Sequence, residues 1–375
     1  MRLCTWLASA MLAFVFVWTP AQARQPADET HSHTLHSTIL NEDRSIRVYA
    51  PANLDSTDVS LPVIYALDGD SHLAHLHMVS RLAYFSGYPN VIIVSVENTD
   101  RERDMMFAPT GSSPGGGGAE NFLHFIQDEL IPFVESEYPV SDYRVLFGHS
   151  ASGGFGAFAI TAAPALFDAY MLATPNVHWR DFQMIDRLES TMNSGALDHT
   201  AIYVTLANET GDEAEGVRRF AELIETANNP LWRFRSHPDE SHTSLPLVTG
   251  HYGLKFIFAD FQLSPDVRAQ GLTAIIDYYA RLGERFSYDP RVPQRILLDY
   301  GYALLADEDA PGAEAVFRHF LAAYEGNPLA MYGLGDSLEA LGRYGEAAEQ
   351  FERITWMDPG LVERAAALRE RDAQD

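Results

Sequence analysis

Cysteine is nearly absent from the sequence: the single thiol among 375 residues, Cys4, lies close to the N-terminus. One thiol excludes an intramolecular disulfide framework and a thiolate zinc site. Positive charge is also scarce, because 26 lysines and arginines oppose 52 aspartates and glutamates and leave a formal charge of -26. Nucleic acids and anionic membranes attract the opposite sign, so no nucleic-acid partner is expected and adsorption to membranes is disfavoured.

The N-terminal segment lacks the length of a membrane-spanning helix. Its apolar run covers residues 7–18, whereas a span needs about 20 apolar residues. Arg2 precedes the run, and Ala21 and Ala23 follow it in a small-x-small cleavage pattern, so residues 1–23 are predicted to be a signal peptide. An uncleaved membrane anchor is the alternative. Cleavage near Ala23 would leave a periplasmic or secreted protein with no cysteine and no membrane span.

Residues 24–37 are polar, hold three histidines and are predicted to form a flexible linker. A metal-binding tail is the alternative, but the histidine spacing matches no closed ligand set. Residues 38–261 alternate apolar runs with helical patterns, which predicts an α/β domain with a mostly parallel sheet covered by helices. Strands are predicted at 45–49, 61–67, 91–96, 143–147, 170–174, 201–206 and, at the sheet edge, 231–236; helices are predicted at 71–83, 119–136, 216–227 and 245–258.

Residues 98–118 show neither pattern and are predicted to be a loop. Its glycine-rich part, residues 111–118, does not match a phosphate-binding loop, because no lysine follows it and it does not follow a strand. A mobile flap or hinge beside the functional site is the favoured interpretation.

Residues 265–375 show long helical patterns and no strand signal. Gly335 and Phe351 fall on the tetratricopeptide pattern, and the positions 34 residues earlier hold Gly301 and Phe317. About two tetratricopeptide-like repeats are therefore predicted in a small all-α region. Because short arrays are rarely stable alone, we expect this pair of repeats to pack against the α/β domain. Such repeats also make the region a candidate site for a protein partner.

The central motif is Gly-His-Ser-Ala-Ser-Gly at residues 148–153. It lies between the predicted strand at 143–147 and a helical segment of small residues. A serine in a tight turn between a strand and a helix is the nucleophile elbow of an α/β-hydrolase fold, in which the hydroxyl of Ser150 stands clear of its neighbours. Ser152 replaces the usual second glycine, and its small side chain is expected to fit.

In this fold the nucleophile is followed along the chain by an acid and then by a histidine. Glu209 comes directly after the strand at 201–206, and His242 lies in the loop after the next strand. Glu209 is therefore the predicted acid and His242 the predicted general base. Asp212 and Glu213 lie within one helical turn of Glu209 and are alternatives for the acid.

Two backbone N–H groups must stabilise the oxyanion that forms during acyl transfer. The predicted donors are those of Ala151, directly after the serine, and Asp70, in the loop after residues 61–67. Asp68 and Asp70 precede several histidines and suggest a metal site as the alternative. The ligand spacing fits no closed set, so neither a metal nor a cofactor is expected.

Further landmarks accompany these residues through most of residues 38–261. They are Tyr-Ala-Leu-Asp-Gly-Asp at 65–70, Asn-Thr-Asp-Arg at 98–101, Glu-Leu-Ile-Pro-Phe at 129–133, Gly-His-Ser at 148–150, Pro-Ala-Leu-Phe-Asp-Ala at 164–169 and Pro-Asp-Glu-Ser-His at 238–242. The chain thereby resembles the esterase family that contains enterochelin (trilactone siderophore) esterases, S-formylglutathione hydrolases, feruloyl esterases and mycolyltransferases. The resemblance implies Ser150 as nucleophile and His242 as catalytic histidine. It also implies that Trp179 lines the substrate site, to which His149 is assigned as well.

These features together predict an exported serine ester hydrolase that forms an acyl-enzyme on Ser150. Its substrate would be a small-molecule ester, such as a siderophore lactone. An acyltransferase using the same residues is one alternative. The other is a non-catalytic tetratricopeptide binding protein in which the hydrolase fold serves as a scaffold.

Overall fold

The computed structural model describes residues 29–51, 60–109, 114–288 and 291–374. The predicted signal peptide lies outside these residues, as does part of the predicted glycine-rich flap. No helix within the described ranges is long and apolar enough to cross a membrane.

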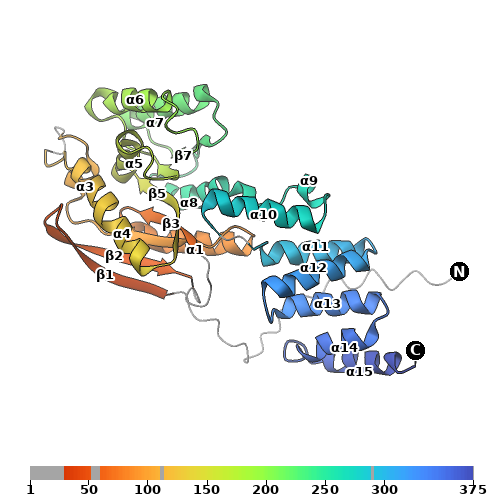
Figure 1. Ribbon diagram of the computed structural model, residues 1–375. Helices are drawn as coiled ribbons and strands as arrows, with labels where there is room; N and C mark the ends of the chain where they lie inside the picture. Colours follow the sequence, from red (N-terminus) through yellow and green to blue (C-terminus); the bar gives the residue numbers. More distant parts are fainter. Residues whose placement is uncertain (1–28, 52–59, 110–113, 289–290, 375) are drawn as a thin grey trace.

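In the described part of the chain, eight strands form one sheet in the order β1-β2-β4-β3-β5-β6-β7-β8 (Figure 1). The pairs β1–β2 and β2–β4 are antiparallel, and all other neighbours are parallel. The predicted mostly parallel sheet is therefore confirmed, and β8 forms the predicted edge. The strands are β1 (Glu29–Ser37), β2 (Glu42–Ala50), β3 (Leu61–Ala66), β4 (Ile92–Val96), β5 (Val140–His149), β6 (Ala169–Ala173), β7 (Ala201–Leu206) and β8 (Trp232–Ser236).

Helices cover both faces of the sheet, because alternate residues of each buried strand point to opposite sides. Val63 and Tyr65 of β3 join the core beneath α3 to α7, whereas Ile64 and Ala66 join the core beneath α1, α8 and α10. The helices of this domain are α1 (Gly69–Phe85), α2 (Arg101–Met105), α3 (Ala119–Phe125), the π-helical turn η2 (Ile126–Leu130), α4 (Ile131–Glu137), α5 (Ala151–Ala162), α6 (Trp179–Met192), α7 (Gly211–Ala227), α8 (Leu245–Ile257) and the short η3 (Ala259–Phe261).

The linker prediction is wrong for residues 29–37, which form β1 and pair with β2 along their whole length. Their side chains alternate between exposed and covered positions, as expected of a strand with one covered face. His33 is one of the covered residues: its Nε2 lies 2.6 Å from the Tyr138 hydroxyl, and its ring meets the Phe133 ring edge-on at 5.2 Å. The alternation was missed because two of the four covered positions carry histidines, which were counted as polar.

The loop prediction is wrong for residues 101–105, which form α2. The carboxylate of Asp100 caps this helix by accepting a hydrogen bond from the Arg103 N–H. Asp104 then pairs with Arg44 of β2, with 2.6 Å between Oδ2 and Nη1, and both side chains are completely buried. The Arg44 guanidinium also lies over the Phe122 ring at 5.1 Å. The two members of this buried ion pair lie far apart in the chain, so no local pattern in the sequence shows the pair.

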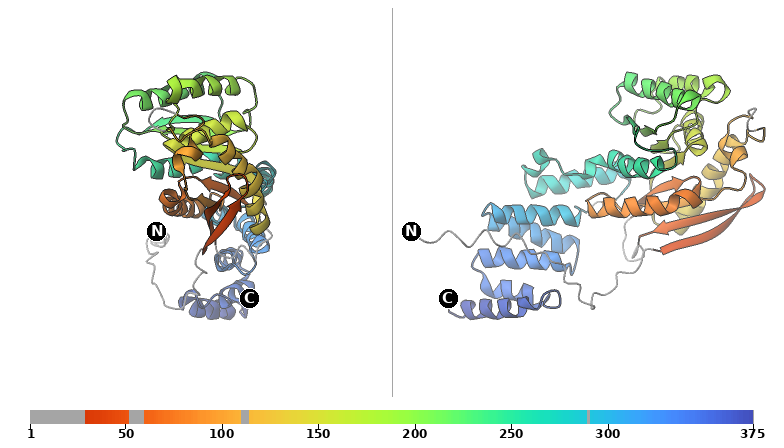
Figure 2. Two further views of the ribbon diagram at one scale, coloured as in Figure 1. Left: turned by 90° about the vertical axis from the view of Figure 1, so that its left-hand side faces the viewer. Right: turned by 180° about the vertical axis from the view of Figure 1, so that it is seen from behind.

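The C-terminal region of the described chain is all-helical and extends away from the sheet as a stack (Figure 2). Packing of the predicted repeats themselves against the α/β domain stays a prediction, because the contact with that domain is made by α10, which precedes them. The Phe286 ring of α10 lies 4.7 Å from Tyr143 of β5 and 5.2 Å from Phe261, and the Tyr279 hydroxyl donates to the Phe261 carbonyl at 2.6 Å. The helices are α9 (Pro265–Arg268), α10 (Leu272–Phe286), α11 (Gln294–Ala306), α12 (Ala310–Ala323), α13 (Pro328–Ala340), α14 (Tyr344–Glu352) and α15 (Gly360–Asp372).

The same glycine–phenylalanine contact occurs twice in this stack, 34 residues apart. A Cβ at Gly301 would lie 2.5 Å from the Phe317 ring, and a Cβ at Gly335 would lie 2.6 Å from the Phe351 ring. Only glycine therefore permits these helices to approach. The periodic residues pack as the repeat pattern requires, while the tetratricopeptide assignment itself stays a prediction.

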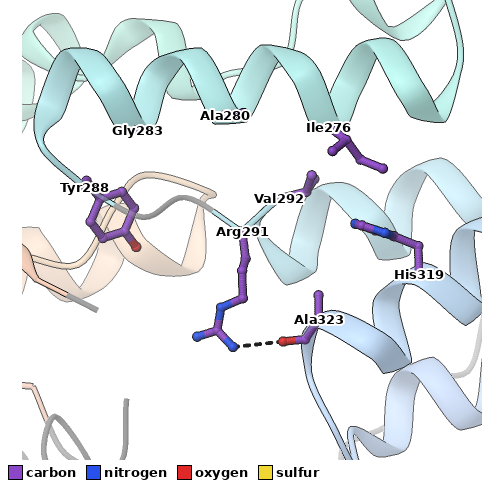
Figure 3. Close-up of a pocket in the computed structure, with 8 residues that line it drawn as sticks. All are labelled: Ile276, Ala280, Gly283, Tyr288, Arg291, Val292, His319 and Ala323. Carbon is purple, nitrogen blue, oxygen red and sulfur yellow. Dashed lines mark hydrogen bonds between the residues drawn. The ribbon is translucent and has the colours of Figure 1, made fainter. Parts of the chain in front are cut away.

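A hollow of about 370 Å³ remains where this stack meets α10 (Figure 3). Its walls are mostly apolar, and the Arg291 guanidinium closes one side by donating to the Ala323 carbonyl at 2.8 Å. The hollow belongs to the helical region and not to the strand ends that carry Ser150. Its lining residues are Ile276, Ala280, Gly283, Tyr288, Arg291, Val292, His319 and Ala323.

Candidate active site

Ser150 occupies the tight turn between β5 and α5, as predicted. Its backbone has φ 59° and ψ -118°, a strained conformation for a residue with a side chain. The chain can turn this sharply because Gly148 and Gly153 have no Cβ. A Cβ at Gly148 would collide with the Ser152 carbonyl, and one at Gly153 would lie 2.9 Å from the Pro175 Cα. The geometry of a nucleophile elbow is therefore present.

Ser152 does more than fit in place of glycine. Its side chain is buried, and its hydroxyl accepts the His149 N–H at 2.8 Å and donates to the Asp68 carboxylate at 2.7 Å. The hydroxyl thereby connects the elbow to the loop that follows β3. A glycine at this position would supply neither contact.

Asp68 connects three loops at the carboxyl edge of the sheet. Arg101 donates to both carboxylate oxygens, at 2.6 and 2.8 Å, and Asn98 donates to one at 2.6 Å. Burial would raise the pKa of the Asp68 carboxyl, but the hydrogen bonds and charge of Arg101, helped by Ser152 and Asn98, hold that pKa below its usual value. Asp68 is therefore an ionised anchor. Local patterns in the sequence assign no role to Asn98 and Arg101. Both belong to a landmark that only the family resemblance points out.

The structure brings His242 and Glu209 together. His242 Nδ1 lies 2.7 Å from Glu209 Oε1, and the same oxygen accepts a hydrogen bond from the Thr174 hydroxyl at 3.0 Å. The Glu209 side chain is only 7% exposed. Glu213 is farther away, with 3.8 Å between its Oε1 and His242 Nδ1, and no ion pair joins Asp212 to His242 among the described residues. The geometry therefore favours Glu209 among the three candidate acids. Thr174 had no signal in the sequence.

His242 also lies beside the elbow. Its ring centroid is 4.4 Å from that of His149, the residue directly before Ser150. Within the described chain no hydrogen bond joins the Ser150 hydroxyl to His242, and such bonds are often long in unliganded hydrolases and shorten when substrate binds. The structure thus places the predicted serine, histidine and acid in one site.

The two predicted oxyanion donors lie in the first turns of two helices whose N-termini point at this site. Ala151 is the first residue of α5, and Asp70 is the second residue of α1, so their N–H groups lie in first helical turns and have no intrahelical acceptor. The side chain of Asp70 is directed elsewhere: it binds Arg47 at 2.6 Å and is 72% exposed. Its backbone is therefore the part available to a ligand.

Trp179 and His149, the predicted substrate-binding residues, both flank the elbow. Trp179 begins α6 and is half-buried, and its ring would lie 3.4 Å from a Cβ at Gly154, one turn after Ser150. The His149 Nε2 is buried and has no hydrogen-bond partner among the described residues. Both side chains are thus placed next to the serine, on opposite ends of the turn.

The histidines of α1 contact one another and neighbouring rings. Among the described residues, no group of three or more His, Cys, Asp or Glu side chains is arranged to hold a metal ion. His72 Nδ1 lies 2.9 Å from His75 Nε2, whereas the His77 ring turns away and stacks on Tyr49 at 3.8 Å. These contacts are structural.

Three histidines, one buried and two partly buried, make this domain sensitive to acid. Burial lowers the pKa of His149 to about 3, aided by the nearby His242 and His72. Burial and the neighbouring His75 lower the pKa of His72 to about 4, and burial with His149 lowers that of His75 to about 4. The folded protein therefore keeps these rings neutral at pH values where the unfolded chain already binds protons.

We expect the free energy of unfolding to fall as the pH decreases from about 6.5 to about 4, because unfolding then takes up protons; each histidine contributes a slope of up to about 1.4 kcal/mol per pH unit. Urea titrations across this range measure the slope. His75→Gln should reduce this slope by up to about 1.4 kcal/mol per pH unit, the contribution of one proton. His199→Gln, a change at an exposed position, should leave the slope unaltered. An unchanged slope in His75→Gln would contradict the assignment.

The sequence matches a family of esterases over most of the α/β domain. Residues 37–245, more than half of the chain, match the family known as "Putative esterase". The chain is similar to the ferri-bacillibactin esterase BesA of Bacillus subtilis, with 25% identity over 191 residues that cover 44% of this chain and 66% of that protein. It is also similar to the siderophore triacetylfusarinine C esterase of Aspergillus fumigatus, with 25% identity over 241 residues, or 54% and 82% of the two chains.

One solved structure covers a larger part of the molecule. An IroE-like serine hydrolase from Shewanella oneidensis superposes with a TM-score of 0.67 and 25% identity, covering 78% of this chain and 100% of that one. The predicted α/β-hydrolase fold is confirmed, and by its sequence, sheet and elbow the chain belongs to this family of ester hydrolases.

Proposed function

We propose that the chain is an exported serine ester hydrolase that cleaves siderophore lactones or similar small carboxylic esters. The observation that carries the proposal is the 2.7 Å hydrogen bond between His242 and the buried Glu209, beside the strained turn of Ser150. A serine hydroxyl is a weak nucleophile until an adjacent base removes its proton, and this pair supplies such a base. Export is proposed from the signal-peptide pattern.

In the proposed reaction, His242 Nε2 takes the proton of Ser150 as its oxygen attacks the ester carbonyl carbon. Glu209 holds the opposite ring nitrogen protonated and stabilises the imidazolium that forms. The N–H groups of Ala151 and Asp70 bind the oxyanion, and each such donor contributes about 3 kcal/mol to the transition state. His242 then protonates the departing alcohol, which leaves an acyl-enzyme.

Water completes the turnover. His242, neutral again, removes a proton from water, and the resulting hydroxide attacks the acyl carbon through the same oxyanion geometry. The bond to Ser150 breaks, the serine regains its proton from His242, and the carboxylic acid leaves. An alcohol in place of water would make the protein an acyltransferase.

The siderophore assignment rests on the relatives, two of which are named for siderophore esters. The tetratricopeptide assignment of the C-terminal helices, and a protein partner bound there, remain predictions from the repeat pattern.

Labelling with diisopropyl fluorophosphate tests the proposal. We expect one phosphoryl adduct per chain, located on Ser150 by peptide mass spectrometry, with loss of p-nitrophenyl butyrate hydrolysis in parallel with labelling. His242→Gln should remain unlabelled under the same conditions, because its serine is not activated. Full labelling of another serine together with loss of activity would contradict the assignment.

A panel of esters then addresses the substrate. Iron-loaded and iron-free trilactone siderophores, feruloyl esters and acetylated sugars are incubated with the protein, and the released acids are measured by chromatography. Adding an alcohol acceptor separates hydrolysis from acyl transfer, because a transferase would form the new ester at the expense of the free acid.

A further inference from the structure

A cavity of about 550 Å³ lies at the β8 edge of the sheet, on the face covered by α8. Its floor is formed by β7 and β8, and its walls by α8, η3 and α10. Residues 233 and 235 of β8 alternate with residues 232, 234 and 236, so the arginines at both positions project to the same face. α8 contributes Lys255, which is the only lysine in the sequence. The cavity therefore gathers several cations in a chain with a formal charge of -26.

Most of these cations lack an acidic partner. Arg285 is paired with Asp260, which is the only carboxylate among the described residues that line the cavity. In the part of the chain that the structure describes, Arg233, Arg235 and Lys255 form no ion pair with a carboxylate. Carboxylates outnumber basic side chains two to one in this sequence, so three unpaired cations in one cavity are unexpected. Like charges at close range repel one another unless an anion lies between them.

Aromatic rings form the apolar part of the cavity. The Arg233 guanidinium lies over the Phe256 ring, 4.8 Å from its centroid. The Phe256 ring itself lies 5.6 Å from the Tyr203 ring. Tyr252 completes this wall and stacks on His237 at 6.0 Å. A planar guanidinium held on an aromatic face is oriented to bind an oxyanion with two parallel N–H groups.

From this arrangement we propose that the cavity binds a small organic anion with two or more negatively charged oxygens, of the carboxylate or phosphate class, through Arg233, Arg235 and Lys255. The volume suits a ligand of metabolite size. A long polyanion is a poor fit, because the chain as a whole carries a formal charge of -26. This inference does not depend on the chemistry of Ser150.

The cavity is connected to the candidate active site through the chain itself. β8 ends at Ser236 and leads directly into the loop that carries His242, and α8 begins three residues after that histidine. An anion bound by both Arg235 and Lys255 would therefore link β8 to α8, the two elements between which this loop lies. A bound anion is expected to restrain the position of His242.

Isothermal titration of the full chain with citrate and with pyrophosphate tests the proposal, and the two probes separate the carboxylate from the phosphate class. We expect at least one of them to bind the wild type. Arg235→Gln and Lys255→Gln should each weaken that binding by about tenfold, as for the loss of one charge-assisted contact. Arg353→Gln removes one exposed positive charge from α14–α15 and should bind like the wild type.

Circular dichroism melts establish that each variant is folded before titration. Binding that is weakened in Arg235→Gln and Lys255→Gln but not in Arg353→Gln supports a site in this cavity. Equal weakening in Arg353→Gln would overturn the proposal, since it would show a general charge effect. Absence of binding of both probes to the wild type would overturn it as well.

Discussion

Ser150→Ala is expected to lower kcat/KM for p-nitrophenyl acetate by about a hundred-thousand-fold, the scale on which the loss of a nucleophilic serine acts. Alanine removes the hydroxyl oxygen that would form the acyl-enzyme, while the predicted oxyanion donors remain. Among the described residues the Ser150 hydroxyl makes no hydrogen bond, so the fold should survive the change. Initial rates at saturating and limiting substrate measure the loss.

The matched control for this variant is Ser136→Ala, which removes an exposed hydroxyl at the end of α4. Among the described residues that hydroxyl bonds only to the Phe133 carbonyl, at 2.8 Å, so its loss should leave kcat/KM unchanged. A Ser150→Ala protein that melts at the wild-type temperature and keeps a rate within about tenfold of the wild type would refute the nucleophile assignment. The same result would favour a non-catalytic role for the fold.

Glu209→Gln is expected to lower kcat by about ten-thousand-fold with little change in KM, as for other triads that lose the charge of the acid. The Glu209 carboxylate accepts a hydrogen bond from His242 Nδ1 and so keeps Nε2 free to take the proton of the serine. A glutamine amide can donate to Nδ1 instead, which stabilises the wrong tautomer. It also removes the charge that stabilises the imidazolium.

Asp212→Asn and Glu213→Gln distinguish the three candidate acids. Glu213 lies 3.8 Å from His242 Nδ1, beyond hydrogen-bond range, so its variant should lose only a few-fold in rate. Asp212→Asn should behave like the wild type. If Asp212→Asn or Glu213→Gln proves more damaging than Glu209→Gln, the acid has been misassigned. Unfolding measurements on all three variants separate catalytic loss from loss of the fold.

The hydrolase domain could be predicted from local patterns, because its strands and helices carry strong periodic signals. The predicted strand at 201–206 and the predicted start of the helix at 245 agree with β7 and α8. The site residues could be ranked because each follows a strand, and parallel strands end at one edge of the sheet. β1 was missed because half of its covered positions are histidines, and α2 because its anchor is a buried ion pair with β2.

Sequence order alone determined which residues could meet at the site: Ser150, an acid after residues 201–206, and His242. The sequence did not distinguish Glu209, Asp212 and Glu213 as the acid. All three lie within one helical turn, and a sequence pattern shows only their positions.

Tertiary structure favours Glu209, because among the described residues its carboxylate lies 2.7 Å from His242 Nδ1, whereas that of Glu213 lies 3.8 Å away. It also gave Ser152 its role, because the Asp68 carboxylate that binds its hydroxyl lies 84 residues away in the chain. Contacts of that range depend on how the loops at the strand ends are packed, which no local pattern of residues encodes.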